Sequence, residues 1–220
     1  MVVKDSIPAD SLDFILTLIH PYKINLMAQM DEVIANTSGP FTKELPESTL
    51  GNLCADICME VADSIRKQSG FAPADFCFLN NGGLRSNLPS GKISIGNVFE
   101  LMPFENELVL LEISRTDLDS LMDLIAAKGG APVSGVELLI KEKRTVQFAL
   151  RSDPENKMER YTVATSDFLA HGGDGYTLLK KYPVQKTGIK VRDAFIVYFR
   201  NSLMDGKTLQ PLKDGRIKTL

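Results

Sequence analysis

Apolar and polar residues alternate along the chain in ways that separate helical stretches from strand-like stretches. Apolar residues recur at helical intervals in four segments, which predicts helices over residues 9–32, 48–69, 116–127 and 191–203. Short apolar runs with β-branched residues predict strands over residues 31–36, 74–79, 92–95, 107–114, 135–141, 145–151 and 161–165. A helical turn is expected over 96–101, and Pro21 is expected to kink or divide the first helix. Because strands and helices are intermixed without a strict βαβ period, the pattern predicts a mixed α/β (α+β) domain with helices outside mixed sheets.

Composition narrows the class of protein. With 220 residues, 44% of them hydrophobic, the chain is long enough for one domain with a substantial core. Its formal net charge of −3 gives no basic footprint, so a nucleic-acid polymer is not an expected partner. No apolar run approaches the ~18 residues of a membrane span, and residues 1–5 lack the apolar core of a signal peptide. We therefore expect neither a membrane span nor a signal peptide in this sequence.

The three cysteines do not form a disulfide framework, since their number is odd. Cys54 and Cys58 fall on the apolar stripe of the helix predicted over 48–69, and Cys77 lies inside a predicted strand. All three are expected to be core residues and not metal ligands.

Side chains that could carry hydrolysis are sparse. The chain has two histidines, and His20 stands apart from any other candidate ligand. His171 and Asp174 would make half a metal site, but a usable site needs about three ligands, and no further cluster has ligand spacing. The Gly-Lys-Ser/Thr element of a nucleoside-triphosphate loop is also missing. We therefore expect no catalytic residue, metal or cofactor in this chain.

Two glycine-rich loops each combine a flexible backbone with a charged side chain. LNNGGLRS contains Asn80 and Arg85, and SDFLAHGGDGY contains Asp174. Two phenylalanines stand beside chain breakers, Phe104 in MPFEN and Phe168 just before the second glycine pair. Taken singly, the first loop could be a turn with a solvated arginine, and each ring could belong to the core. Taken together, these residues predict a binding constellation.

The order of these motifs resembles a known family. LNNGGLRSNLPSGKISIGNVFELMPFENELVLLEIS, followed by YTVATSDFLAHGGDGY, resembles the C-terminal domain of the 5′-nucleotidase, UDP-sugar hydrolase and 2′,3′-cyclic phosphodiesterase family. The resemblance covers residues 31–220, whereas residues 1–30 resemble the linker-type helix that joins two domains in longer members. It implies a layered α/β/β/α domain with mixed sheets.

The resemblance also implies a set of substrate-binding residues. They are Asn80, Gly83, Arg85, Phe104, Asn106, Phe168, Gly173 and Asp174. Phe104 and Phe168 would sandwich the base, since ring stacking is worth about 1 to 3 kcal/mol per base and tolerates different bases. Asn80 would read the base edge, whereas Arg85 and Asp174 would hold ribose hydroxyls, with Arg85 also close to the phosphate. Asn106 would line the same pocket, and Gly83 and Gly173 belong to the two glycine-rich loops that form it.

The sequence departs from the family pattern in two places. Family members carry further arginines shortly before the Gly-Asn-Leu helix, but here only Lys43 is basic in that segment. A lysine point charge does not reproduce a bidentate guanidinium, so phosphate anchoring is expected to be weaker. The metallophosphatase motifs Asp-x-His, Gly-Asn-His-Glu and Gly-His are absent as well.

The expected function is therefore recognition of a nucleoside or nucleotide, either adenosine- or AMP-like or a UDP-sugar, within a 5′-nucleotidase-type phosphohydrolase. Catalysis and its divalent metals are expected in a metallophosphatase domain that is encoded separately or has been removed. By analogy with the family, the protein is expected in the periplasm or outside the cell. Two alternatives stay open, namely a non-catalytic nucleoside-binding or sensing module and a structural protein that kept the fold and lost the ligand.

Overall fold

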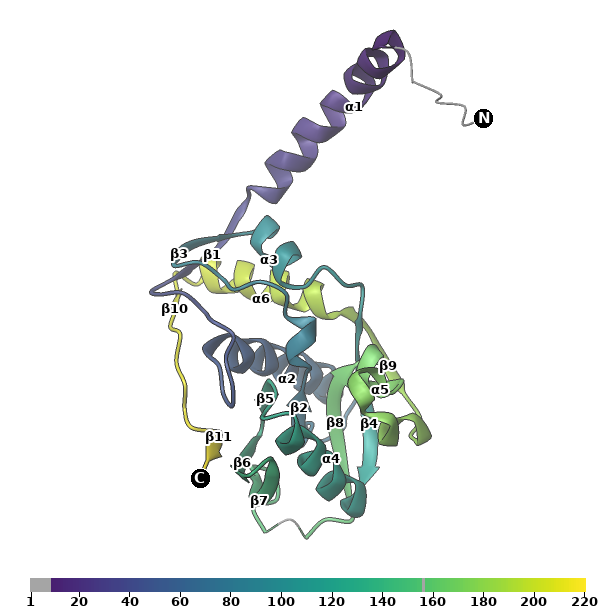
Figure 1. Ribbon diagram of the computed structural model, residues 1–220, viewed down its shortest axis with the longest axis vertical. Coiled ribbons are helices and arrows are strands. Elements are labelled where there is room, and N and C mark those ends of the chain that lie inside the picture. Colours follow the sequence, from purple (N-terminus) through teal and green to yellow (C-terminus); the bar gives the residue numbers. More distant parts are fainter. Residues whose placement is uncertain (1–8, 156) are drawn as a thin grey trace, which may run out of the picture.

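A five-stranded mixed sheet forms the centre of the fold (Figure 1). The computed structural model describes residues 9–155 and 157–220. The sheet has the order β5-β2-β8-β4-β9, formed by Val133–Ser134, Phe76–Phe78, Arg160–Ser166, Glu107–Ser114 and Gln185–Lys190. Strand β2 is parallel to β8, whereas β4 is antiparallel to both β8 and β9. The mixed α/β class predicted from the sequence is confirmed.

Of the two smaller sheets, one lies next to the base of α1 in Figure 1 and the other lies in the part of the molecule farther from α1. The sheet β10-β1-β3 is formed by Thr208–Leu209, Val33–Thr37 and Gly91–Ser94. The sheet β11-β6-β7 is formed by Ile217–Thr219, Val136–Lys141 and Arg144–Leu150. In each of them one pairing is parallel and one antiparallel, so these sheets are mixed as well.

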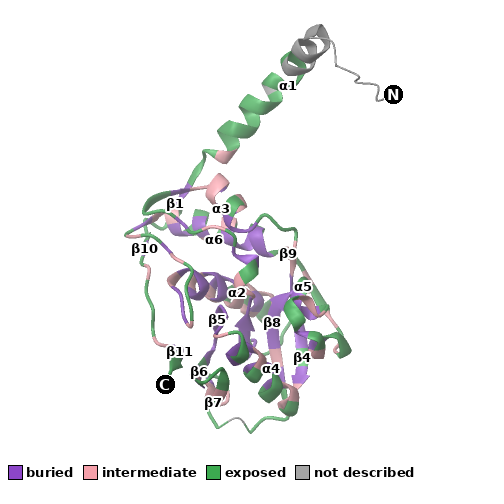
Figure 2. Ribbon diagram, in the orientation of Figure 1, coloured by how far each residue is buried: buried purple, intermediate pink, exposed green. Residues whose placement is uncertain are grey.

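Helices cover both faces of the central sheet. Those in the described part of the chain are α1 (Ala9–Met30), α2 (Thr49–Gln68), α3 (Ile95–Leu101), α4 (Arg115–Ala127), α5 (Asp167–Ala170) and α6 (Val191–Met204). One hydrophobic core joins the sheet to α2, α3, α6 and β1, and the other joins it to α4, β6 and β7. Successive residues of β4 alternate between them, because side chains alternate across a strand: Leu110 belongs to the first core and Leu111 to the second. Figure 2 shows the buried segments gathered around this sheet.

Helix α2 forms where its sequence pattern predicts. The Ser48 side chain caps its first turn by accepting the Gly51 N–H at 2.9 Å. Cys54 and Cys58 point into the first core, where Cys77 of β2 also lies, and all three thiols are free and buried. Burial raises the pKa of the Cys54 and Cys77 thiols. The cysteines are core residues, as expected.

Helix α1 extends away from the other elements (Figure 1) and contacts α3 near its C-terminal end. Pro21 does not divide this helix, because one helix is assigned from Ala9 to Met30. Described apolar side chains on this helix are exposed, among them Leu18, Ile19, Tyr22, Ile24, Leu26 and Met27. No described helix is long and apolar enough to cross a bilayer. Residues 1–8 of the expected linker lie outside the described residues.

Four strands have no clear signal in the sequence. Strand β9 reads QKTGIK, which is mostly polar, and it is held by its pairing with β4. Strands β5, β10 and β11 are two or three residues long, too short for a period-2 pattern. Their positions depend on tertiary partners, which local patterns do not encode.

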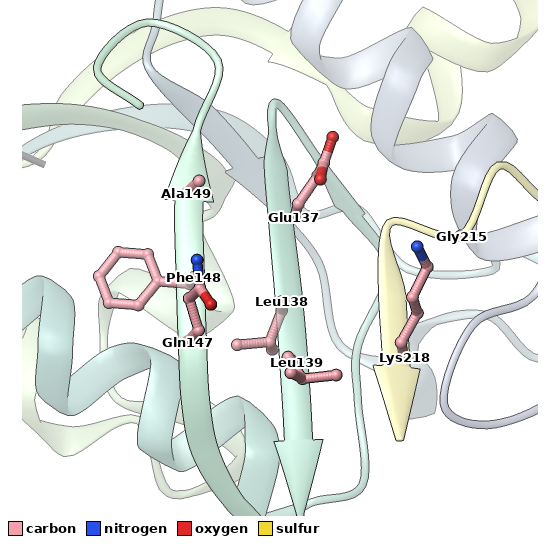
Figure 3. Close-up of a pocket in the computed structure, with 8 residues that line it drawn as sticks. All are labelled: Glu137, Leu138, Leu139, Gln147, Phe148, Ala149, Gly215 and Lys218. Atoms are coloured by element: carbon pink, nitrogen blue, oxygen red, sulfur yellow. The ribbon is translucent and has the colours of Figure 1, made fainter. Parts of the chain in front are cut away.

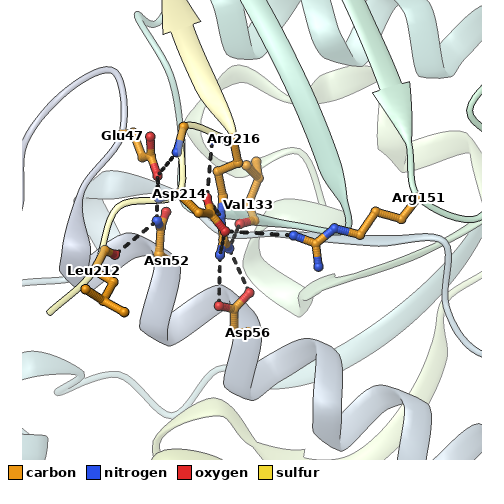
Figure 4. Close-up of polar contacts among 9 residues, drawn as sticks. Glu47, Asn52, Asp56, Val133, Arg151, Leu212, Asp214 and Arg216 are labelled. Atoms are coloured by element: carbon orange, nitrogen blue, oxygen red, sulfur yellow. Dashed lines mark hydrogen bonds and ion pairs between the residues drawn. The ribbon is translucent and has the colours of Figure 1, made fainter. Parts of the chain in front are cut away.

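The C-terminal segment is held by a buried arginine (Figure 4). The Arg216 guanidinium, 6% exposed, donates to both carboxylate oxygens of Asp56 at 2.7 and 3.0 Å. It also donates to Asp214 at 2.8 Å and to the carbonyl of Val133 at 2.7 Å. Asp56 lies in α2, Val133 in β5, and Arg216 directly precedes β11. This one side chain therefore ties the chain end to both the central sheet and α2.

We expect Arg216→Met to lower the free energy of unfolding by about 3 kcal/mol. This is the lower end of the range for breaking a buried pair, because Asp56 and Asp214 keep partial contact with water. Urea denaturation followed by circular dichroism measures the loss. Arg151→Met is the matched control, since Arg151 is 62% exposed and lies 3.8 Å from Asp214. Equal losses in the two variants would contradict a special role for Arg216.

The same contacts predict a pH dependence. Hydrogen bonding to Arg216 lowers the pKa of Asp214 from its ordinary 3.8 to about 2. Because the folded pKa is the lower one, the stabilisation is present above about pH 4 and is lost as the pH falls toward 2. The loss should be on the order of 1 kcal/mol, since solvent screens the half-exposed Asp214 carboxylate. Urea titrations at pH 7, 4 and 2.5 should show a shallower acid dependence for Asp214→Asn than for the natural chain; parallel curves would disprove the assignment.

Candidate functional site

Three segments of the chain meet at one edge of the central sheet. Because β2 and β8 are parallel, the loops that follow Phe78 and Ser166 leave the sheet at the same edge. Strand β4 is antiparallel to β8, with Leu108 opposite Ser166, so the segment before β4 arrives at this edge too. These three segments carry all the site residues predicted from the sequence.

The loop after β2 contains one short 3-10 turn, Asn81–Gly83. Gly83 is buried, and a Cβ at this position would come within 2.8 Å of Asn80 Oδ1, so a larger residue here would displace the Asn80 side chain. The backbone N–H of Arg85 donates to the carbonyl of Leu101 at 2.8 Å. The loop is thereby joined to the C-terminal end of α3.

In the loop after β8, the Phe168 ring packs against the backbone of Gly173. The Ser166 side chain caps the short helix α5, which contains Phe168. The Phe168 ring lies against the backbone of Gly173, where a Cβ would come within 2.5 Å of the ring carbons. Asp174 follows with φ of 55°, in the left-handed region that Asp tolerates better than most residues. Glycine at position 173 therefore lets the ring and the carboxylate project from one turn.

The three segments enclose a cavity of about 270 Å³. Its lining residues are Asn80, Gly82, Gly83, Arg85, Phe104, Asn106, Phe168 and Asp174. Phe104 is 41% exposed and Phe168 is 44% exposed, so neither ring belongs to the hydrophobic core. Of the predicted residues, Gly173 supports the Phe168 ring and is not a lining residue, whereas Gly82 lines the cavity and was missed. The sequence did contain a signal for Gly82, because it is the first residue of the Gly82–Gly83 pair.

Polar groups of opposite charge face this cavity. Asn80 Nδ2 donates to Asp174 Oδ2 at 2.8 Å and so links the two glycine-rich loops. The other carboxylate oxygen of Asp174 has no hydrogen-bond partner among the described residues. Arg85 Nη1 donates to the carbonyl of Gly82 at 3.3 Å, and its side chain is otherwise exposed. Two rings, one carboxylate and one guanidinium suit a planar ligand that carries hydroxyl or anionic groups.

Lys43, which the sequence offered as the basic residue upstream of α2, supports the first loop. Its Nζ donates to the carbonyl of Leu84 at 2.9 Å and to that of Asn81 at 3.5 Å. Its backbone N–H donates to Asn87 Oδ1 at 2.9 Å. These bonds hold the backbone on either side of Gly83. Lys43 does not line the cavity.

Other parts of the surface offer weaker candidates. A hollow of about 200 Å³ lies on the sheet β11-β6-β7 (Figure 3), where the charged side chains are Glu137 and Lys218. It is formed by neighbouring strands, and Phe148 is the one aromatic residue in its lining. Of the two residues considered as half a metal site, His171 has its Nδ1 2.7 Å from the carbonyl of Asp167, and Asp174 accepts from Asn80. Within residues 9–155 and 157–220, no three potential metal ligands gather.

Comparison with known proteins agrees with the sequence motifs. The family model described as "5'-nucleotidase, C-terminal domain" matches residues 33–181. Protein UshA of Escherichia coli K12 is 24% identical over 178 residues, which cover 76% of this chain and 30% of that protein. The trifunctional nucleotide phosphoesterase protein YfkN of Bacillus subtilis is 29% identical over 78% of this chain and 12% of its own length. The chain thus spans a third or less of these two relatives.

Solved structures give the same relationship. The 5′-nucleotidase precursor from Thermus thermophilus superposes with a TM-score of 0.73 at 25% identity, over 94% of this chain and 43% of that one. The NAD nucleotidase of Haemophilus influenzae has the same fold, with a TM-score of 0.68 at 18% identity over 92% of this chain and 40% of that one. Because the family model matches well over half of the residues, the chain belongs to the family of 5′-nucleotidase C-terminal domains.

Proposed function

We propose that this chain is the nucleoside- or nucleotide-recognition part of a 5′-nucleotidase-type phosphohydrolase. The observation that carries the proposal is the meeting of Phe104 and Phe168 at one cavity, with Arg85 and Asp174 beside them. Phe104 lies in the segment before β4 and Phe168 in the segment after β8, and both rings are accessible. A slot of this kind accepts a flat heterocycle, because every base presents a π-face to the rings.

The polar groups assign an orientation to the ligand. With the base between the rings, the Asp174 carboxylate accepts hydrogen bonds from ribose hydroxyls, and Asn80 contacts the base edge. Arg85, which lines the same cavity, donates to sugar or phosphate oxygens. Lys43 is engaged with backbone carbonyls, so Arg85 is the principal cation for a phosphate. Most of the binding free energy should therefore come from the nucleoside portion.

Hydrolysis would be supplied by a metallophosphatase domain or chain, which would also hold the divalent metals. Supporting this division, the chain matches a C-terminal domain and spans under half of the two solved relatives. Helix α1, with its exposed apolar side chains, would pack against that catalytic part. The substrates would be AMP-like nucleotides or UDP-sugars, handled in the periplasm or outside the cell.

Two other functions are separated from this one by simple measurements. A sensing module would bind adenosine but would never stimulate a metallophosphatase encoded beside it. A structural protein would give no thermal shift with adenosine, AMP or UDP-glucose. Ligand at 100 times its dissociation constant should stabilise the chain by roughly 2.7 kcal/mol, which a melting curve detects.

We expect Phe104→Ala and Phe168→Ala each to weaken adenosine binding by about tenfold or more. The physical reason is the loss of a stacking face worth about 1 to 3 kcal/mol. Isothermal titration calorimetry gives the affinities. Phe71→Ala is the matched control, because Phe71 is 58% exposed and lies outside the cavity. If both cavity variants bind like the control, the rings do not hold the base.

Asp174→Asn should weaken adenosine binding by about tenfold while leaving adenine binding unchanged. The substitution removes the charge that accepts from the sugar, and such charged hydrogen bonds contribute about 1.5 to 3 kcal/mol. Asn tolerates the left-handed backbone at this position, and its amide oxygen still accepts from Asn80. Competition calorimetry with the two ligands measures the difference. An equal loss for adenine would place Asp174 against the base instead of the sugar.

A further inference from the structure

We propose that Glu105 is a positioning residue, whose carboxylate fastens the loop carrying Phe104 to the start of α6. The proposal rests on the function proposed for the cavity, because an ion pair outside the cavity would hold the loop that forms one of its walls. Glu105 does not line the cavity, although both of its sequence neighbours do. It therefore acts on the ligand only through the loop.

Two side chains of the β9–α6 junction hold the Glu105 carboxylate. Oε2 accepts from Lys190 Nζ, and Oε1 accepts from Arg192 Nη2. Lys190 is the N-cap residue of α6, so the carboxylate lies beside the positive end of a 14-residue helix, where negative charge is favoured. The Val191 N–H adds a backbone bond at 2.9 Å to the carbonyl of Asn106. Glu105 and Asn106 together attach the loop to one helix terminus.

Arg192 is a rigid anchor for this attachment. It is 7% exposed, and its guanidinium lies over the Phe99 ring at 4.2 Å from the centroid. Phe99 belongs to α3, which ends directly before the loop. Arg192 Nε is buried without a hydrogen-bond partner among the described residues, so packing and Glu105 fix the guanidinium. The arginine thus joins α6 to α3 and to the loop that follows α3.

The loop that carries Phe104 has few attachments to the rest of the molecule. The Glu105 side chain is 59% exposed, whereas the Arg192 side chain that it contacts is 8% exposed. Loss of the Glu105 carboxylate therefore leaves a buried guanidinium without its partner, which lowers the free energy of unfolding in addition to releasing the loop. Phe104 and Pro103 are exposed as well, so few apolar contacts hold this part of the loop in place. The ion pair therefore determines where the Phe104 ring stands, while the core determines whether the chain folds.

The chain has no tryptophan, so Phe104→Trp creates a single fluorescent reporter on this loop. In that background, Glu105→Lys opposes Lys190 and Arg192 with a like charge. We expect lower fluorescence anisotropy and at least twofold faster acrylamide quenching of the reporter, both measured at a temperature where each variant is fully folded. In the natural background, Glu105→Lys should weaken adenosine binding about fivefold.

Matched variants separate this effect from general destabilisation. Glu112→Lys breaks the exposed ion pair between Glu112 of β4 and Arg160 of β8. This variant should leave the reporter unchanged. A reporter at Phe168→Trp should also be insensitive to Glu105→Lys, because that ring rests on Gly173 in another loop. Exchange of the two charges, Glu105→Arg with Arg192→Glu, should restore part of the anisotropy.

The fluorescence arm decides the proposal without any ligand. If Glu105→Lys leaves the quenching and anisotropy of the Phe104→Trp reporter unchanged, Glu105 does not position the loop and the proposal is overturned. The same holds if the Phe168→Trp reporter responds equally, since the change would then be global. Failure of the natural chain to bind adenosine would instead refute the function proposed for the cavity, and the fluorescence result would still decide the position of the loop.

Discussion

The direction in which β2, β8, β4 and β9 pair is the constraint on which the rest of the structure depends. The parallel pair β2–β8 places two glycine-rich loops at one sheet edge, and the antiparallel neighbour β4 brings the Phe104 loop to the same edge. Strand β9 pairs antiparallel with β4, so the start of α6 arrives there as well. Four segments far apart in the sequence thus meet without any of them crossing the core.

Folding and the proposed recognition depend on different sets of residues. Two hydrophobic cores on opposite faces of the sheet, together with the buried Arg216 contacts, hold the chain in its fold. The cavity instead uses exposed rings and half-exposed polar groups, which contribute little to those cores. The bond from Asn80 to Asp174 and the pinned backbone of Arg85 hold the cavity walls in place before any ligand arrives. Such preorganisation reduces the entropy lost on binding.

The sequence predicts the mixed α/β class, the main helices and the buried cysteines, because each depends on a local period of apolar residues. It also indicates the residues that surround the cavity, since glycines and an Asp at positive φ mark turns that carry side chains. It does not predict the mostly polar β9 or the two- and three-residue strands, whose partners are distant in the chain. Nor does it give the contacts of Lys43 and Arg216, because a charge in a sequence does not reveal whether it will face solvent, backbone or a carboxylate.

The central claim is that two phenylalanine rings from separate loops form a slot for a planar base. A crystal structure of this chain with adenosine tests it most directly. The account predicts the purine stacked between Phe104 and Phe168, with the ribose hydroxyls within hydrogen-bond distance of the Asp174 carboxylate. Adenosine bound at another place on the surface, or bound in the cavity without contact to either ring, would contradict the claim.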